Sequence, residues 1–438
     1  MDTINSSLDA AISEAEAQYA AVNPGSAARH QAARQSMPGG NTRTVLHYSP
    51  FPLAWAKGEA ATLTDLDGHT YLDFLGEYSA GLYGHSNPII RQAIRRALDD
   101  GIVLGGPNRY EAELAAAIRG RFPSMQMLRF CNSGTEANLF AMMTARAITG
   151  RKAAMVFEGG YHGGVFYFSH GGLPINVPMP WVIAPYNDID GTKALIREHW
   201  RDLAAIVIEP MMGGGGCLPA DRNFLQALRE AASELGIILI FDEVMTSRLS
   251  SGGLQATLGI TPDMTTLGKY LGGGLSFGAF GGRTDIMRHY DPEAEGSWPH
   301  AGTFNNNVLS MAAGLAGLTE VYTPEAAIEL NGRGDRLRDG INALAKKHDV
   351  GVLATGLGSF IGIHFTRKPV TRPQDLEEED EPRREKLQKL MHLDMIAGGI
   401  YLARRGFIAL SLAITDADIE KFLAAFEEFI QSRKALIG

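Results

Sequence analysis

Lys269 is the residue of this sequence best placed to do chemistry. It lies in the stretch TTLGKYLGGG, where a short apolar run stops at a glycine. A lysine that is buried or lies near another positive charge loses its proton more easily. Its neutral amine is then a nucleophile toward carbonyl groups. We therefore interpret Lys269 as a nucleophile for an aldehyde or a ketone.

Two further features suit a lysine of that kind. Asp242 ends the apolar run GIILIFD, where a buried carboxylate is costly without a cationic partner. Ser133, Gly134 and Thr135 open a helical stretch, and N–H groups at a helix start suit a phosphate. Together they are the set of residues expected for pyridoxal phosphate. The lysine would bind the aldehyde, the aspartate the pyridinium nitrogen and the turn the phosphate. Taken singly, the turn could be a plain helix cap and Asp242 could cap the helix after it.

Three more candidates follow apolar runs. Tyr161 comes after two glycines that would let a flat ring approach the cofactor, although ordinary packing is the alternative. His162 is either a structural or a catalytic histidine. Glu209 either pairs locally or orients the surroundings of Asp242 or the cofactor hydroxyl. These residues are therefore predicted cofactor contacts with a structural alternative for each.

The elements that must position these residues have the pattern of an α/β fold. From about residue 88 to 318, short apolar runs alternate with helical periodicity, which is typical of parallel strands covered on both faces. Five of the runs end in polar or glycine-rich groups, and ligands bind at the carboxyl ends of such strands. We expect a large domain over 76–322 and a small α+β domain built from 1–75 and 323–438.

Local signals add detail to the two chain ends. The first forty residues predict two helices, and the alternating segment 55–74 predicts a hairpin around Asp67-Gly68. The charged stretch 375–386 predicts a solvated loop or an exposed helix start. Thr415 and the acids after it predict the start of a last helix.

Composition excludes several classes of function. The chain has 438 residues, 45% of them apolar, and a net charge of −9, which argues against binding to nucleic acid or to an anionic membrane. Its two cysteines have no partner at metal-ligand spacing, so neither a disulfide framework nor a metal site is expected. Without a secretory signal or an apolar run of bilayer length, the expected location is cytoplasmic.

With these residues assembled, the sequence resembles the class III aminotransferases of fold type I, which use pyridoxal phosphate. The resemblance covers nearly the whole chain and rests on NSGTEAN, GGYHG, EP, DEVMTSR, LGKYLGGG and AGTFNNN. It implies a mostly parallel sheet of the seven-stranded type and a homodimer with the site at its interface. It also implies roles for single residues. Lys269 would form the Schiff base, Asp242 would bind the pyridine nitrogen, and Tyr161 would stack on the ring. Ser133, Gly134 and Thr135 would bind the phosphate, and Thr303 would reach the phosphate of the neighbouring subunit.

Within that family two branches resemble this chain. MPGGNTR, GYHGG and DEVMT are similar to glutamate-1-semialdehyde aminomutase, whereas NTRTVLHYSPFPL and FNNN look like the β-amino-acid aminotransferases, especially those for β-phenylalanine. That second group holds substrate carboxylates with two arginines, matched here by Arg43 and by Arg405 in RGF. A guanidinium binds a carboxylate bidentately. Tyr78 and Met245 are candidate apolar walls of the pocket. The alternatives are a surface loop for Arg43, an ion pair for Arg405, and plain packing for the walls.

The function favoured by these residues is transfer of an amino group from a β-amino acid to an α-keto acid, 2-oxoglutarate or pyruvate. A glutamate-1-semialdehyde 2,1-aminomutase, which is an isomerase, is the main alternative. A non-catalytic regulator is disfavoured because no basic DNA-binding module fits in this acidic chain. A dehydrogenase is disfavoured because the glycine clusters lack the dinucleotide fingerprint.

Overall fold

The fold is seen in a computed structural model that describes residues 2–377 and 380–438. Its centre is a seven-stranded sheet in the order β4-β12-β11-β10-β7-β5-β6. Only β12 runs antiparallel to its neighbours, and the other pairings are parallel. The predicted α/β fold with a mostly parallel sheet is confirmed. The strands are β4 (Met127–Cys131), β5 (Ala153–Phe157), β6 (Trp181–Ala184), β7 (Leu203–Ile208), β10 (Ile238–Asp242), β11 (Met264–Gly268) and β12 (Gly278–Gly282).

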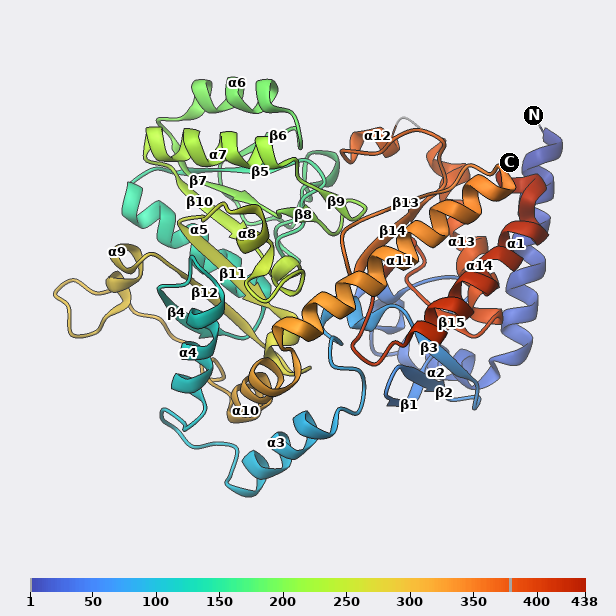
Figure 1. The fold of residues 1–438 in the computed structure, drawn as a ribbon, viewed down its shortest axis with the longest axis horizontal. Coiled ribbons are helices and arrows are strands. Elements are labelled where there is room, and N and C mark those ends of the chain that lie inside the picture. The colour runs from blue at the N-terminus through green and yellow to red at the C-terminus, as the bar shows by residue number, and fades with distance from the viewer. Residues whose placement is uncertain (1, 378–379) are drawn as a thin grey trace.

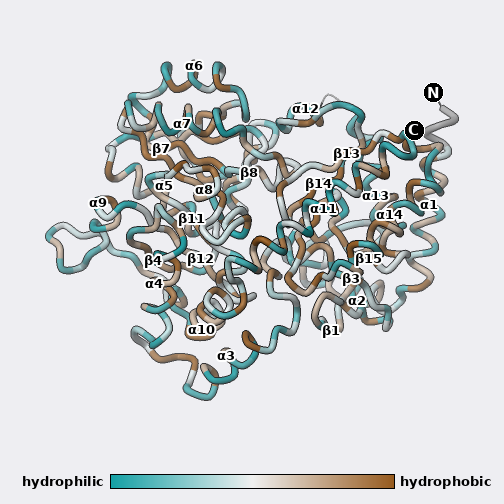
Figure 2. The backbone as a smooth tube through the Cα atoms, viewed as in Figure 1, coloured by the Kyte–Doolittle hydropathy of each residue, from teal (hydrophilic) through white to brown (hydrophobic). Residues whose placement is uncertain are grey.

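Helices cover both faces of this sheet (Figure 1). Alternate residues of the same strand pack in different clusters: Val207 packs with the residues of α5 (Gly134–Thr149), and Ile208 packs with those of α6 (Ile189–His199) and α7 (Arg222–Leu235). This two-sided burial explains why the strands are continuous apolar runs rather than alternating ones. Figure 2 shows the hydrophobic residues gathered along these inner segments.

A second set of sheets joins the two ends of the chain. β1 (Trp55–Glu59), β2 (Thr62–Asp65) and β3 (Thr70–Asp73) form a sheet with β15 (Ile400–Tyr401), which pairs parallel to β3. A three-stranded sheet contains β13 (Leu353–Thr355), β14 (Phe360–His364) and β16 (Phe407–Ala409). Figure 1 shows these blue and red segments side by side. The domain boundaries at 75/76 and 322/323 stay predictions.

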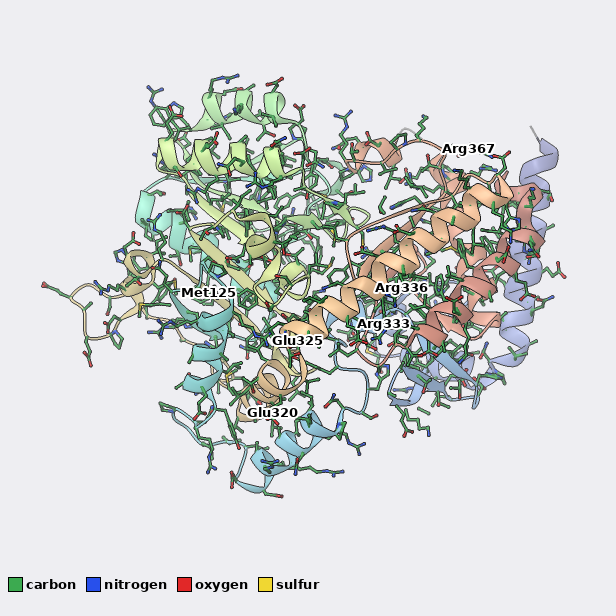
Figure 3. All side chains as sticks on the ribbon, in the orientation of Figure 1. Met125, Glu320, Glu325, Arg333, Arg336 and Arg367 are labelled. Carbon is green, nitrogen blue, oxygen red and sulfur yellow. The ribbon has the colours of Figure 1, made fainter. Side chains whose placement is uncertain are left out.

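The longer helices of this part are α1 (Asp2–Val22), α11 (Pro324–His348), α13 (Glu381–Ala397) and α14 (Asp416–Ile437). Arg333 and Arg336 of α11 both reach Asp416 at the start of α14, at 3.0 and 2.6 Å (Figure 3). The remaining helices and short strands are α2 (Pro24–Ala33), α3 (Pro88–Asp99), α4 (Glu111–Arg121), α8 (Gly253–Leu258), α9 (Thr284–Met287), α10 (Val308–Ala316), α12 (Gln374–Glu377), β8 (Met211–Met212) and β9 (Leu218–Pro219).

Most of the local expectations are confirmed. The turn at Asp67-Gly68 joins β2 to β3, and α14 begins with Thr415 and Asp418 capping each other. A second hairpin, between β1 and β2, was not predicted, and its turn contains Ala60 with a φ of 49°. The charged stretch includes α12 and the start of α13, and its residues 378–379 lie outside the described part.

Two expectations from the sequence concern the location of the protein: that it does not span a membrane and that it is cytoplasmic. Among the described residues, no helix has both the length and the apolar character needed to cross a membrane. The cytoplasmic location stays a prediction.

Candidate active site

Five strand ends place the candidate residues at one edge of the central sheet. β4, β5, β7, β10 and β11 all run in the same direction, because β12 is antiparallel to both β4 and β11. Their carboxyl ends lead into Ser133, Tyr161, Glu209, Asp242 and Lys269, respectively. The structure therefore brings the predicted residues to the edge where ligands of α/β sheets bind.

Lys269 directly follows the last residue of β11 and has an uncommon backbone conformation, with a φ of 56°. Its Nζ donates a hydrogen bond to the carbonyl oxygen of Tyr78 at 2.6 Å. Burial lowers its pKa to about 8, although the charge of Asp242 acts in the opposite direction. The amine is therefore neutral in a larger fraction of molecules near neutral pH than an exposed lysine would be.

Asp242 is buried and accepts three hydrogen bonds. Its Oδ2 accepts from Asn138 Nδ2 at 2.7 Å and from His162 Nδ1 at 2.8 Å, and its Oδ1 accepts from the amide of Val244 at 3.0 Å. Burial opposes a charge on His162, but the hydrogen bond and the negative charge of Asp242 prevail and raise its pKa above 6.5. His162 thus gives Asp242 a hydrogen-bond partner within the chain itself.

Asn138 was not singled out from the sequence, although it ends the motif NSGTEAN. Besides Asp242, its amide donates to the carbonyl of His162 at 2.9 Å, and its Oδ1 accepts from Thr266 Oγ1 at 2.7 Å. Asparagine is a poor residue for a helix interior, because its side chain competes for backbone hydrogen bonds. An asparagine in the second turn of α5 was therefore the sequence signal that could have identified Asn138.

The residues at this edge fit pyridoxal phosphate. Ser133 caps α5 by accepting from the amide of Glu136 at 3.1 Å, as the simple-cap alternative expected. The amides of Gly134 and Thr135 have no acceptor among the described residues, so they remain available to a phosphate at the helix start. A carboxylate has about four acceptor positions, so Asp242 has one left for a ring N–H.

Glu209 accepts hydrogen bonds from two loops near Asp242. It accepts from the amide of Tyr161 at 3.0 Å and from the amide of Gly213 at 2.9 Å, and burial raises its pKa to about 7. The ring of Tyr161 is 47% exposed and meets Tyr167 edge-on at 5.7 Å. Met245 packs against Gly213, where a Cβ atom would lie 2.7 Å from the methionine Cε. Glu209 thus holds the residue next to His162, and its role toward the cofactor stays a prediction.

Arg43 and Arg405, from opposite ends of the chain, meet at one aromatic ring. Their guanidinium carbons lie 5.5 and 5.7 Å from the centroid of Tyr78, which stacks on Phe407 at 5.8 Å. Arg43 also forms an ion pair with Glu77. Both guanidinium groups therefore lie beside the residue whose carbonyl accepts from Lys269.

Thr303 lies apart from these contacts. It is exposed in the segment between the turn Arg288–Tyr290 and α10, next to Phe304, which is 64% exposed. Its predicted role toward a neighbouring subunit stays a prediction.

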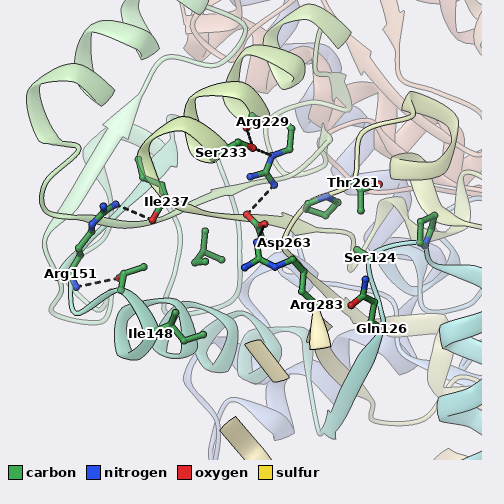
Figure 4. Close-up of a pocket in the computed structure, with 16 residues that line it drawn as sticks. Ser124, Gln126, Ile148, Arg151, Arg229, Ser233, Ile237, Thr261, Asp263 and Arg283 are labelled. Atoms are coloured by element: carbon green, nitrogen blue, oxygen red, sulfur yellow. Dashed lines mark hydrogen bonds and ion pairs between the residues drawn. The ribbon is translucent and has the colours of Figure 1, made fainter. Parts of the chain in front are cut away.

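A cavity of about 720 Å³ lies at the opposite edge of the sheet (Figure 4). Its lining includes Ile238 and Asp263, at the amino ends of β10 and β11. Arg229 and Arg283 both pair with Asp263, and Arg151 donates to main-chain carbonyls. Asp263 and the three arginines therefore have partners within the protein, and none of the predicted site residues lines this cavity.

Comparisons with known proteins agree with this geometry. Residues 45–430 match the family described as aminotransferase class-III. The chain is 48% identical to beta-phenylalanine transaminase of Variovorax paradoxus over 433 residues, 99% of each chain. The solved structure of a beta-phenylalanine aminotransferase from that organism superposes with a TM-score of 0.96, covering 98% of this chain and 99% of that one.

Two further structures extend the comparison. An omega-transaminase from Sphaerobacter thermophilus is 36% identical, with a TM-score of 0.88 over 93% of this chain and 98% of that one. A glutamate-1-semialdehyde aminomutase from Pseudomonas aeruginosa PAO1 has a TM-score of 0.89 over 97% and 98%, but at 22% identity it shows the fold alone. The resemblance found in the sequence is confirmed: the chain belongs to the class III aminotransferases, which are pyridoxal-phosphate-dependent transaminases.

Proposed function

We propose that this enzyme transfers the amino group of a β-amino acid, an aryl or alkyl 3-aminopropanoate such as β-phenylalanine, to an α-keto acid, 2-oxoglutarate or pyruvate. The observation that carries the proposal is the pair Arg43 and Arg405, which meet at the ring of Tyr78 beside Lys269. The 48% identity to a beta-phenylalanine transaminase over the full length supports it.

Pyridoxal phosphate, when bound, supplies an aldehyde that joins amines and a ring that accepts electrons from the amine-bearing carbon. Lys269 would hold the aldehyde and, once released, move a proton with its Nζ. Asp242 would hold the ring N–H, and Asn138 and His162 would keep that carboxylate in place. The amides of Gly134 and Thr135 would bind the phosphate, and the exposed ring of Tyr161 would cover the cofactor ring.

The two arginines suit a pocket that must accept two different substrates in turn. A β-amino acid carries its carboxylate one carbon further from the amine than the acid produced from an α-keto acid does. Two guanidinium groups, each able to bind a carboxylate bidentately, can serve these two positions. Tyr78 and Met245 would form apolar walls for the aryl or alkyl group.

The aminomutase alternative uses the same fold but needs no keto acid. Its solved example is 22% identical, so that likeness does not extend to the reaction. The two functions are separated by whether an amino donor and a keto acceptor are consumed together.

We also propose a homodimer, with Thr303 reaching the cofactor phosphate of the neighbouring subunit. Large apolar side chains are exposed on the single chain, including Val103 at 85%, Ile175 at 65% and Phe304 at 64%. Single exposed apolar side chains also occur on monomers, so the support for a dimer comes from the class III family to which the chain belongs. Phe304, the residue after Thr303, would be covered by that contact.

The reaction itself is tested by half-reactions followed by cofactor absorbance. We expect 3-amino-3-phenylpropanoate to convert the bound cofactor to its amine form and 2-oxoglutarate to restore it. Lys269→Ala should fold but lose turnover, because one amine serves as nucleophile and proton carrier. A response to glutamate-1-semialdehyde alone would instead support the aminomutase.

The carboxylate role is tested by Arg43→Met and Arg405→Met, with Arg404→Met as the matched control. Arg404 is the exposed neighbour of Arg405. Loss of a charged hydrogen bond of roughly 1.5–3 kcal/mol predicts an increase in KM of about 10- to 100-fold for one substrate. Amines without a carboxylate should react as before. An equal effect of Arg404→Met on KM would contradict the assignment.

The state of Lys269 is tested by trapping it with pyridoxal phosphate and borohydride at several pH values. Because its pKa is lowered to about 8, the neutral amine predominates above that pH, and labelling of Lys269 should level off there. A short peptide with a single lysine provides the control, because an unperturbed lysine has a pKa of about 10.4 and should label increasingly up to about that pH. Parallel profiles for the two lysines would show that burial does not activate Lys269.

The dimer is tested by sedimentation of the wild type and of Phe304→Asp. We expect the wild type to sediment as a dimer and the charged variant to dissociate, since an unpaired carboxylate is costly in an apolar contact. Affinity for pyridoxal phosphate should fall with dissociation. A wild type that remains a monomer at micromolar concentration would refute the shared site.

A further inference from the structure

Arg248 is a buried cation that the proposed reaction does not use. It ends the motif DEVMTSR in the turn Thr246–Arg248, shortly after β10, and its side chain is fully buried. Burial lowers its pKa to about 10, so it remains charged at neutral pH. Burying a guanidinium is unfavourable unless its hydrogen bonds to water are replaced. An arginine at such a place needs a structural or functional reason.

The partners of Arg248 are main-chain groups from distant parts of the chain. It pairs with no carboxylate among the described residues. Its guanidinium donates to the carbonyl of Ser79 at 3.4 Å and to that of Leu410, and it lies 5.0 Å from the ring centroid of Phe360. Its Nε has no acceptor among the described protein groups. Arg248 thus joins the segment after β3 to the C-terminal strands β14 and β16.

The segment that contains Ser79 has a strained backbone. Gly76, Glu77, Tyr78 and Ser79 have consecutive positive φ values of 53°, 48°, 51° and 81°. The left-handed conformation is unfavourable for residues other than glycine, because it brings Cβ too close to the following carbonyl oxygen. A turn of this kind persists only when its surroundings hold it in place.

This turn contains Tyr78, the residue that Lys269, Arg43 and Arg405 all contact. The carbonyl of Tyr78 accepts from Lys269, and its ring is the one that Arg43 and Arg405 approach. The carbonyl of Ser79, which Arg248 holds, belongs to the next peptide group. The peptide group that Arg248 contacts is therefore next to the one that contacts Lys269.

Other contacts also hold this turn, at its entry, within it and at the carbonyl of Tyr78, which accepts from Lys269 at 2.6 Å. Asp73 Oδ1 accepts from the amides of Leu75 and Gly76 at 2.9 and 3.0 Å. Within the turn, the amide of Gly81 donates to Gly76 at 2.9 Å. Among the side chains of the described residues, Arg248 is the one that donates to the main chain of Ser79.

We propose that Arg248 is a positioning residue that holds the left-handed turn 76–79 against the strand end at Leu410, and that this hold places Tyr78 for Lys269 and for the two arginines. The assignment of Arg43 and Arg405 as carboxylate ligands rests on the proposed function. The hold on the turn does not depend on any substrate.

Amide hydrogen exchange of the cofactor-free protein tests the hold directly. Arg248→Met keeps much of the side-chain length but loses the donors. Exchange at Tyr78, Ala80 and Gly81, whose amides are bonded within the turn, should become at least about tenfold faster. Arg151→Met is the matched control, because Arg151 also donates to main-chain carbonyls, at the opposite edge of the sheet. It should leave exchange in the turn unchanged.

The loaded enzyme gives the second readout. Small displacements of a site cost up to about 100-fold in rate, so kcat/KM for the amino donor should fall at least about tenfold in Arg248→Met and stay unchanged in Arg151→Met. Arg248→Lys, which keeps the charge with fewer donors, should lie between wild type and Arg248→Met in both measurements. It also carries the test if the methionine variant does not fold.

Two results would overturn the proposal. One is exchange in the turn that stays at the wild-type rate in Arg248→Met, or in Arg248→Lys if that is the folded variant. The other is exchange that rises equally throughout the protein, as expected if Arg248 only stabilises the core. Because the exchange measurement involves no substrate, it still decides the hold if the enzyme acts on an amine other than a β-amino acid.

Discussion

A buried carboxylate at the end of a buried strand is the constraint on which the site depends. A carboxylate buried without hydrogen-bond donors is costly, and Asp242 receives its donors from α5, from the loop after β5 and from its own turn. Each donor belongs to an element that also carries a cofactor-binding candidate. The need to satisfy one carboxylate therefore sets the positions of the helix start at Ser133 and of the loop at Tyr161.

The same burial shifts the protonation of the neighbouring groups toward neutral pH. It lowers the pKa of Lys269 to about 8 and raises that of Glu209 to about 7, while Asp242 raises that of His162. The pKa values of Lys269 and Glu209 thus lie near pH 7, and shifts of this kind cluster at active sites. At this edge of the sheet, then, the packing that stabilises the strands also prepares the amine of Lys269 for chemistry.

Much of the central sheet could be predicted because burial on two faces requires continuous apolar strands. The strand β12 could not be predicted, because its sequence GAFGG is poor in strand-forming residues. Its glycines permit close approach: a Cβ at Gly278 would lie 2.7 Å from the sulfur of Cys131. The turn at Ala60 was missed for a related reason, since alanine at a positive φ gives no turn signal.

Within the site, sequence reasoning found residues that end strands and missed those that act through them. Lys269 and Asp242 stand where apolar runs stop, which is visible in a sequence. Asn138 and Arg248 lie inside elements, and their importance comes from partners more than a hundred residues away. Spacing along the chain does not show such contacts.

The meeting of Arg43 and Arg405 has a different origin from the rest of the site. The cofactor side is built by strands of one continuous region, whereas the arginines arrive from the two chain ends, which β3 and β15 join by pairing. The turn 76–79 is the connection between these parts, since Tyr78 contacts both Lys269 and the arginines. Among the described contacts neither arginine touches Asp242, so residues of the chain ends can change while the donors to that carboxylate stay the same. This separation gives a physical reason why an aminomutase and transaminases share this fold while their reactions differ.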